Sequence, residues 1–290
     1  MANMFDLTLR LAMKLGTFRE GLATAGTDTT HTTDTSRVEG DDTFNGGTLW
    51  VIWDADGADA APQGEWARVT DFVKSTGVIT HDALTAATAA GDRYGISTGR
   101  YPLDVLKSAI NSVLIEYKQV LYDTTSLDTV NQQSELTLPA GITGANLVQV
   151  YAQTNDDADD NRWVPINYHV LEAATGSQHT LVIDSRNVSS DVDLMLEYTN
   201  YINPLYNADD EVDPVVPVVA ILPQAAYQAE LIRQRTFGSE SKLDIAMLKH
   251  FEEQAQQARR RWPMRPIVGR GKVIERSTFR GVRVAPPPRP

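Results

Sequence analysis

The spacing of apolar residues along the chain predicts helices in four places. The clearest helical period covers 102–118, where Pro102 suits the first helical position and apolar residues follow at steps of three or four. These residues are Leu103, Leu106, Ile110, Val113, Leu114 and Tyr117. A shorter amphipathic helix is predicted at 4–15.

Two more helices are predicted near the C-terminus. The first covers 223–237, opening with Pro223 and stopping at Gly238, a residue type that commonly ends helices. The second covers 241–262 and ends before Pro263. Its apolar stripe consists of Leu243, Met247, Phe251, Ala255 and Ala258.

Between the helices, β-branched and aromatic residues in short runs, separated by turn residues, predict strands. In the first stretch the predicted strands are 48–53, 66–72, 78–80 and 94–97, preceded by an extended or looped segment at 24–43. In the second stretch they are 135–138, 147–152, 163–168, 180–183 and 194–199, in the manner of a β-sandwich.

These blocks predict the α+β class: helices near 4–15, 102–118, 223–237 and 241–262, with inserted antiparallel β-barrel or β-sandwich units and an extended C-terminal arm. The predicted segments are 1–100 (a helix and a small β unit), 101–119 (a core helix), 120–205 (a sandwich-like unit), 206–222 (a linker), 223–262 (a helical pair) and 263–290 (a basic arm).

Composition excludes several classes of protein. The 290 residues contain no cysteine, so disulfides, thiolate zinc sites, iron–sulfur clusters and a cysteine nucleophile are excluded. No run of 18 apolar residues predicts a membrane-spanning helix. Asp6, Arg10 and Lys14 interrupt the apolar N-terminal segment and argue against a signal peptide. We therefore expect a soluble protein that is not secreted and does not enter a membrane.

Charge divides the chain unevenly. Residues 259–290 contain ten Lys or Arg against Glu275 alone, a net charge of +9, within a protein whose total is −12. The other 258 residues therefore carry 16 basic and 37 acidic residues, a net charge of −21. A basic arm either binds nucleic acid, stays solvated, or docks on an acidic protein surface; we favour docking. Prolines at the end of the arm favour an extended backbone.

The motifs that would indicate an enzyme are incomplete. Gly95-Ile96-Ser97-Thr98-Gly99 matches the Gly-x-Ser-x-Gly pattern of serine hydrolases, but the predicted helix begins at Pro102 and not directly after Ser97. The acidic loops 54–59 and 155–161 lack a complete calcium-binding pattern, and the five histidines are scattered. We predict no enzyme, no cofactor and no metal site, with a serine hydrolase as the outside alternative.

Six short segments and the two C-terminal helices carry a family resemblance. The segments are Phe44-Asn45-Gly46-Gly47-Thr48-Leu49-Trp50-Val51, Ala90-Gly91-Asp92-Arg93-Tyr94, Tyr101-Pro102-Leu103, Ala109-Ile110-Asn111, Asp123-Thr124-Thr125 and Ser134-Glu135-Leu136-Thr137-Leu138-Pro139. With the helices 224–237 and 241–262, they resemble the neck proteins of tailed bacteriophages, in particular the head-to-tail adaptors. The predicted β content, roughly half of the chain, departs from the compact, nearly all-helical adaptors.

The resemblance implies a structural virion protein at the head–tail junction, made in the host cytoplasm. It implies a ring, usually of twelve copies, in which helices form the ring and the C-terminal arm reaches the portal or a neighbouring subunit. A downstream tail or neck protein would be a further partner, and DNA would pass through the lumen without specific binding.

An arm that adds a strand to a neighbour's sheet gains main-chain hydrogen bonds, with alternate side chains setting the register. The residues that we expect at this interface are Arg265, Arg270, Arg276, Phe279, Arg280 and Arg283. A tail-end, baseplate or fibre-attachment protein remains the alternative in the structural class, distinguished by what the arm binds.

Overall fold

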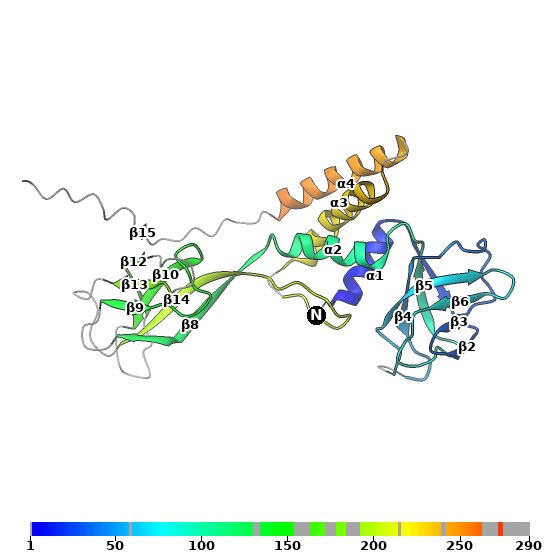
Figure 1. Cartoon of the computed structure of the whole chain (residues 1–290), viewed down its shortest axis with the longest axis horizontal. Helices are drawn as coiled ribbons and strands as arrows, with labels where there is room; N and C mark the ends of the chain where they lie inside the picture. Colours follow the sequence, from blue (N-terminus) through cyan, green and yellow to red (C-terminus); the bar gives the residue numbers. More distant parts are fainter. Residues whose placement is uncertain are drawn as a thin grey trace, which may run out of the picture. The chain divides into compact units, whose positions relative to one another are not determined.

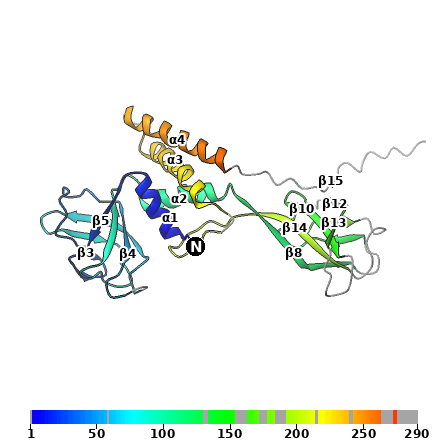
Figure 2. The ribbon, with the colours of Figure 1, turned by 180° about the vertical axis from the view of Figure 1, so that it is seen from behind.

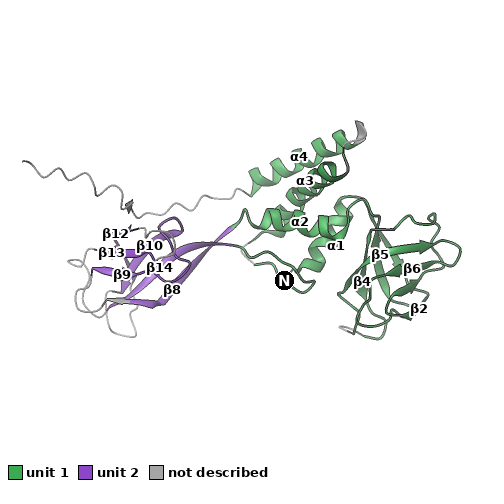
Figure 3. Cartoon of the chain, in the orientation of Figure 1, with its two compact units in different colours: residues 1–117, 202–264 green, residues 118–201, 265–290 purple. Residues whose placement is uncertain are grey.

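The computed structural model describes residues 2–57, 60–129, 134–153, 163–171, 178–183, 192–213, 216–238, 242–262 and 272–274. Within these residues the chain is a mixed α+β protein with four helices and three sheets (Figure 1). The class and the four helices agree with the prediction. It divides into two compact units (Figure 3), which are described separately. Unit 1 comprises residues 1–117 and 202–264, and unit 2 comprises residues 118–201 and 265–290.

The helices of unit 1 lie together in the ribbon (Figure 2), and they share one apolar core. They are α1 (Met4–Lys14), α2 (Leu103–Leu114), α3 (Val218–Phe237) and α4 (Lys242–Arg261). Their shared core contains Leu7 and Leu11 of α1, Ile110 of α2, Ala225 of α3 and Phe251 of α4. Small alanines in α3 allow the other helices to approach it closely, and every described face of its central turns is at least partly covered.

Two helix boundaries differ from the prediction by more than one residue. Helix α3 begins at Val218, so Pro223 lies inside it and removes one intrahelical hydrogen bond. The earlier start places Ile221, which is fully buried, in the shared core, and this burial offsets the cost of the proline. Helix α2 ends at Leu114, ahead of the predicted 118.

The described part of the segment expected to be a linker, 206–222, contributes residues to the core of unit 1. Val212 and Val216 are buried among the helices. The carbonyl oxygens of Ala208 and Asp210 accept hydrogen bonds from the first turn of α1, at 2.9 and 3.0 Å. These bonds satisfy amide groups that a helix N-terminus leaves unpaired, so this segment serves as a cap and not as a free connector.

Unit 1 also contains a seven-stranded antiparallel sheet in the order β1-β7-β4-β5-β6-β3-β2. Its strands are β1 (Phe18–Leu22), β2 (Ala25–Asp28), β3 (His31–Thr33), β4 (Thr48–Trp53), β5 (Trp66–Val73), β6 (Val78–His81) and β7 (Arg93–Ser97). Trp50 of β4 joins this sheet to the helices, because its ring is buried in their core and its Nε1 donates to Thr8 Oγ1 at 3.1 Å.

Unit 2 consists of two four-stranded sheets. The first has the order β11-β10-β14-β8 and contains β8 (Lys118–Thr129), β10 (Leu147–Gln153), β11 (Trp163–Ile166) and β14 (Val192–Tyr201). The second has the order β15-β12-β13-β9 and contains β9 (Glu135–Thr137), β12 (Tyr168–Leu171), β13 (Thr180–Ile183) and β15 (Lys272–Ile274). Both sheets contribute to one apolar core, as facing sheets do.

The strand prediction needs three corrections. The predicted strand 163–168 is two strands in different sheets, β11 and β12, which meet at Asn167. The strands β1 and β8 were not predicted, and β8 is the longest of the described strands. None of the three sheets closes into a barrel within the described residues, so the barrel alternative is not supported.

Candidate functional site

The predicted interface residues of the arm lie outside the described residues. These are Arg265, Arg270, Arg276, Phe279, Arg280 and Arg283. The described part of the arm is β15, which pairs in parallel with β12 of the same chain. The register places Lys272 opposite His169, Val273 opposite Val170 and Ile274 opposite Leu171. The candidate assembly site is therefore the edge of β12 together with the strand that occupies it.

The core of unit 2 fixes the orientation of β12. Tyr168 and Val170 are buried, and His169 between them is exposed, as strand alternation requires. The Tyr168 hydroxyl donates to the carbonyl oxygen of Val148 at 3.0 Å, which ties the second sheet to β10 of the first. On one side β12 pairs with β13, where Val170 lies opposite Leu181. On its other side the partner is β15, without which the edge would present unpaired backbone groups.

Charge favours the pairing of the arm with residues 118–201 of unit 2. Residues 118–201 contain three basic and twelve acidic residues, a net charge of −9. Residues 265–290 contain seven basic residues and Glu275, a net charge of +6. Opposite charges of this size attract over several ångströms, and salt weakens the attraction. The edge supplies hydrogen-bonding groups, and the charges favour a basic strand as its occupant.

A second group of polar residues is buried among the helices of unit 1. Glu230 of α3 is fully buried, and both of its carboxylate oxygens bind the Arg233 guanidinium, at 2.6 and 2.9 Å. Arg233 also pairs with Asp244 of α4 at 2.8 Å, and Arg100 reaches the same Asp244 oxygen at 2.7 Å. The Tyr101 hydroxyl donates to Glu230. We call these five residues the helix ion cluster.

The contacts within the helix ion cluster determine the protonation states of Glu230 and Tyr101. Burial would raise the pKa of Glu230, but hydrogen bonds from Arg233, Tyr101 and Gln234 outweigh it, so this pKa lies below its usual value. Burial and the bond to Glu230 raise the pKa of Tyr101 to about 12. At neutral pH the cluster is therefore a carboxylate–guanidinium network with a neutral tyrosine. It joins α3, α4 and the segment before α2 in one fixed arrangement.

The Gly-x-Ser-x-Gly motif has a packing explanation. Ser97 is fully buried in β7, and its Oγ accepts a hydrogen bond from the Thr48 amide at 3.1 Å. A Cβ atom at Gly95 would lie 2.1 Å from the Phe18 ring, and one at Gly99 would lie 2.3 Å from the Asn45 carbonyl oxygen. Both glycines thus allow close approach of neighbouring strands and loops. Within the described residues, no hydrogen bond joins Ser97 to a histidine.

In and near the first acidic loop, carboxylates accept hydrogen bonds from backbone amides of the protein itself. Asp54 accepts the Asp56 amide at 2.8 Å, and Glu65 accepts the Thr85 amide at 2.8 Å. The tip of the first loop, residues 58 and 59, and the whole loop 155–161 lie outside the described residues. Elsewhere, the described residues contain no group of three or more His, Asp or Glu side chains placed to hold a metal ion.

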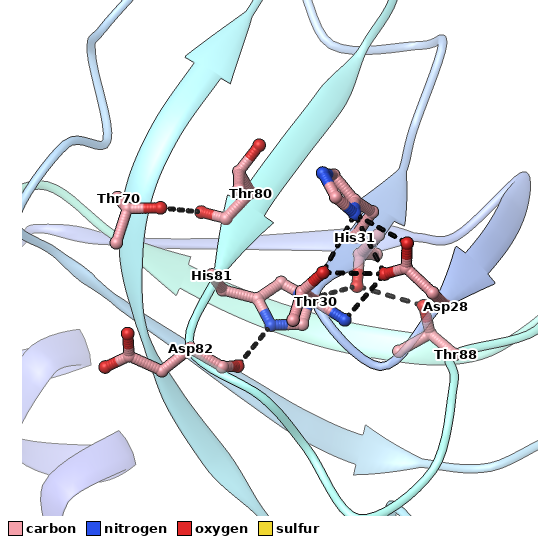
Figure 4. A network of polar contacts seen from close by, with 9 residues as sticks. Asp28, Thr30, His31, Thr70, Thr80, His81, Asp82 and Thr88 are labelled. Carbon is pink, nitrogen blue, oxygen red and sulfur yellow. Dashed lines mark hydrogen bonds and ion pairs between the residues drawn. The ribbon is translucent and has the colours of Figure 1, made fainter.

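Two histidines belong to a hydrogen-bonded network in the seven-stranded sheet (Figure 4). His81 is buried; its Nδ1 lies 2.8 Å from the Asp82 carbonyl oxygen, and its Nε2 lies 3.0 Å from Thr32 Oγ1. Because a carbonyl only accepts, Nδ1 carries the proton and Nε2 accepts from Thr32. Burial lowers the pKa of His81. His31 lies beside it and pairs with Asp28 at 2.8 Å.

A cleft of about 760 Å³ lies in unit 1 beside Trp66 and the start of α2. Lys107 Nζ lies 5.4 Å from the centre of the Trp66 ring. The lining includes Arg68, Asp82 and Asp104, so both signs of charge are present. This mixture does not select a class of ligand.

In comparisons with known proteins, no protein-family model and no curated protein matches the chain. None of the described helices has both the length and the apolar composition needed to cross a bilayer.

Sequence reasoning missed two features of the candidate site. The edge of β12 was hidden because 163–168 had been interpreted as one strand, which displaced the start of β12. The helix ion cluster joins residues more than 100 positions apart, such as Tyr101 and Glu230. From the sequence, only the three-residue spacing of Glu230 and Arg233 on one predicted helix indicated an ion pair.

Proposed function

We propose that this chain is a structural subunit of a tailed-phage neck, forming a ring that joins the portal to the tail and lets DNA pass. In this proposal α1, α2, α3 and α4 are the helical adaptor core of the ring. The seven-stranded sheet and the two sheets of unit 2 are insertions. The resemblance of the short segments and C-terminal helices to neck proteins is the origin of this proposal.

One structural observation supports the adaptor proposal more than any other. Four helices from distant parts of the sequence share a single core, and the last of them is followed directly by the basic arm. The helix ion cluster supports the same reading, since buried ion pairs that lose one partner are costly and therefore hold helices in one geometry. A ring needs subunits of constant shape, because small errors in angle accumulate around its circumference.

Passage of DNA is the second part of the proposal. The 258 residues outside the basic C-terminal segment have a net charge of −21, which repels the phosphate backbone. An acidic lumen would let DNA slide without binding. We therefore expect no measurable affinity of the assembled ring for double-stranded DNA at physiological salt.

The test is electron microscopy of the purified protein, alone and mixed with a portal, with the full chain and with a variant lacking residues 264–290. We expect rings that match the portal symmetry and that dock only when the arm is present. The matched control replaces the arm's Arg residues by Gln and keeps its length, which separates the effect of charge from that of the extended backbone.

Particles that ignore the portal with and without the arm would contradict the adaptor proposal. If such particles instead bind tail-tube or fibre components, the chain belongs to the tail or baseplate. Turnover of an ester substrate that is lost on Ser97→Ala would favour the hydrolase alternative. The burial of Ser97 makes that outcome unexpected.

A further inference from the structure

A short segment after β6 is anchored in the seven-stranded sheet by the hydroxyl group of Thr88. Residues 86–90 read Ala-Ala-Thr-Ala-Ala, and Thr88 is the buried residue among them. Its Oγ1 lies 2.9 Å from Thr32 Oγ1 of β3, which lies 3.0 Å from His81 Nε2. We propose that this segment is an acid-released latch: protonation of His81 breaks the hydrogen bond of Thr88, and residues 86–90 leave the sheet. This inference goes beyond the proposed ring and does not depend on it.

Thr88 packs closely against β2. Gly26 of β2 is the register partner of Thr32, and a Cβ atom at Gly26 would overlap the Thr88 carbonyl oxygen. Glycine at this position therefore lets the backbone of the segment approach the strand. The alanines on either side of Thr88 bury little apolar area, and the Asp92 carboxylate accepts the Ala89 amide at 2.7 Å. The segment is thus held by Thr88 and by the contact of Ala89 with Asp92.

At neutral pH the hydrogen bonds around His81 run in one direction (Figure 4). His81 Nδ1 donates to the Asp82 carbonyl oxygen, and Nε2 accepts from the Thr32 hydroxyl. That hydroxyl has a single hydrogen, so toward Thr88 it is the acceptor and the Thr88 hydroxyl is the donor. Every member of this chain of bonds has a partner while Nε2 carries no proton.

A proton on His81 Nε2 reverses this chain of bonds. Nε2 becomes a donor, so the Thr32 hydroxyl accepts from it and turns its own hydrogen toward Thr88. The Thr88 hydroxyl then needs another acceptor, and no second hydrogen bond of this hydroxyl occurs within the described residues. A buried donor without an acceptor is costly. When residues 86–90 leave the sheet, water supplies the acceptor.

The surroundings of His81 disfavour its charged form in the closed state. Burial is the largest cause, and it lowers the pKa of His81 despite the attraction of Asp28, at the end of β2, and of Asp82, in the loop after β6. His31 on β3 adds repulsion, and the Asp28 carboxylate is already bound to the His31 ring. The register partner on β5 is Val69, which carries no charge. Once the segment has opened, water reaches His81 and stabilises its charge.

Acid therefore favours the open segment. In the closed state the pKa of His81 lies below its value in water, about 6.5, so opening takes up a proton at pH values between these two pKa values. For the uptake of one proton, the ratio of open to closed molecules increases by at most about tenfold for each pH unit. Above the higher pKa neither state carries the proton, and the segment stays closed.

Amide hydrogen exchange, measured by NMR on the full chain, tests the latch. The Ala89 amide contacts Asp92 while the segment is closed, so its protection factor reports the closed state. Between pH 7 and pH 5 we expect this protection factor to fall several-fold. Amides of β4 and β7, in the same sheet, should keep theirs. The ring nitrogen signals of His81 should change from the Nδ1-protonated tautomer to the doubly protonated ring over the same pH range.

His81→Gln is the decisive variant, because a glutamine side chain accepts from Thr32 and does not titrate. Its segment should stay closed at pH 5. The matched control is His31→Gln, which removes the other histidine of the network and should retain the acid release. Thr88→Val keeps the shape of the side chain and removes the hydroxyl. It should lower the protection of Ala89 already at pH 7 and leave little dependence on pH.

Protection of Ala89 that is the same at pH 7 and pH 5 in the unsubstituted chain would overturn the proposal. An acid release that persists in His81→Gln, or one that disappears in His31→Gln, would also overturn it. If His81→Gln does not fold, Thr88→Val still decides, since unchanged protection at pH 7 would show that the hydroxyl is not the anchor. The ring is tested separately by the portal-binding experiment, so failure of the latch and failure of the proposed function are distinguishable.

Discussion

The two units hold their parts together by different means. Unit 1 buries charged and polar side chains: the helix ion cluster joins its helices, and the His81 network joins strands of its sheet. In unit 2 the described contacts of the core are mainly apolar, with the Tyr168 hydroxyl as a polar tie between its sheets. One edge of unit 2 is completed by a strand from the arm.

This difference indicates a division of tasks. Buried ion pairs tolerate few alternative geometries, because a displaced partner leaves a charge without solvent or counter-charge. An open strand edge tolerates any suitable strand, since its hydrogen bonds go to main-chain atoms. Unit 1 is therefore suited to keep a constant shape, whereas one sheet of unit 2 depends on a short strand from the arm to complete its edge. The following predictions test this comparison, from the largest expected effect to the smallest.

The largest effect is expected for Arg233→Ala. This change leaves the buried Glu230 and Asp244 carboxylates without their shared partner, and loss of one partner of a buried pair typically costs about 3–5 kcal/mol. The measurement is urea unfolding followed by fluorescence, to which the buried Trp50 contributes. The control is Arg93→Ala, whose pair with Glu20 is about half exposed and should contribute at most about 1 kcal/mol. Similar losses for both variants would contradict a special role for the cluster.

In unit 2 the corresponding test is Leu181→Ala. Leu181 is fully buried between β12 and β9, and removing a buried leucine side chain costs about 2–5 kcal/mol. Hydrogen exchange at β12 and β13 amides measures the local loss. Val182→Ala, on the other face of β13 and only partly buried, is the control and should cost less. If the two variants exchange alike, the apolar core does not hold this sheet.

The third prediction concerns pH and separates the two units. His81 has a folded-state pKa below the unfolded value of about 6.5, so stability is complete above that pH and falls as acid protonates the unfolded chain. The loss of stability stops once the pH has fallen below the folded-state pKa of His81. The charged and titratable groups that face His81 are His31 from β3, Asp28 at the end of β2 and Asp82 from the loop after β6, and its register partner on β5 is Val69.

Urea unfolding between pH 7 and 5 should therefore show less stability at the acid end. His81→Gln, which cannot gain a proton, should flatten this slope, while His250→Gln on the exposed face of α4 should retain it. A slope that survives His81→Gln would assign the acid sensitivity to other groups. Hydrogen exchange should place the loss in β3 and β6 and leave β12 and β13 unchanged.

The smallest effect on stability is expected for Val273→Pro. Proline removes a backbone donor and restricts φ, so it disrupts the three-residue ladder of β15. The stability of the single chain should fall by no more than about 1 kcal/mol, the net value of a typical hydrogen bond. Assembly, measured by light scattering, should fall much further. Assembly that falls no further than the stability of the single chain would contradict a role of β15 in joining copies.

The sequence alone predicted the class and most of the elements. Apolar residues at helical spacing in α2 are buried as expected, including Leu106, Ile110 and Val113. The run from Thr48 to Trp53 forms β4, and Gly238 follows the last turn of α3. These predictions succeed because periodicity and turn residues act over one or two turns of chain, and local sequence contains that information.

Other features depended on contacts between distant residues. Pro223 lies inside α3 because burial of Ile221 outweighs the local preference of proline for a helix start. Gly95 and Gly99 flank Ser97 in the sequence. The groups that leave no room for a side chain there, the Phe18 ring and the Asn45 carbonyl, are distant in the sequence. Short-range patterns cannot show such causes, since the neighbour that explains each residue is remote in the sequence.

For the candidate site, the sequence by itself determined the charge of the arm, its short apolar run at 273–274 and the absence of a cysteine or complete catalytic motif. Tertiary structure alone decided that β12 is the strand next to the arm and that Glu230, Arg233 and Asp244 meet. The physical reason is that charge and strand propensity are properties of single residues and short runs. An edge or a buried ion cluster exists only after separate elements have packed together.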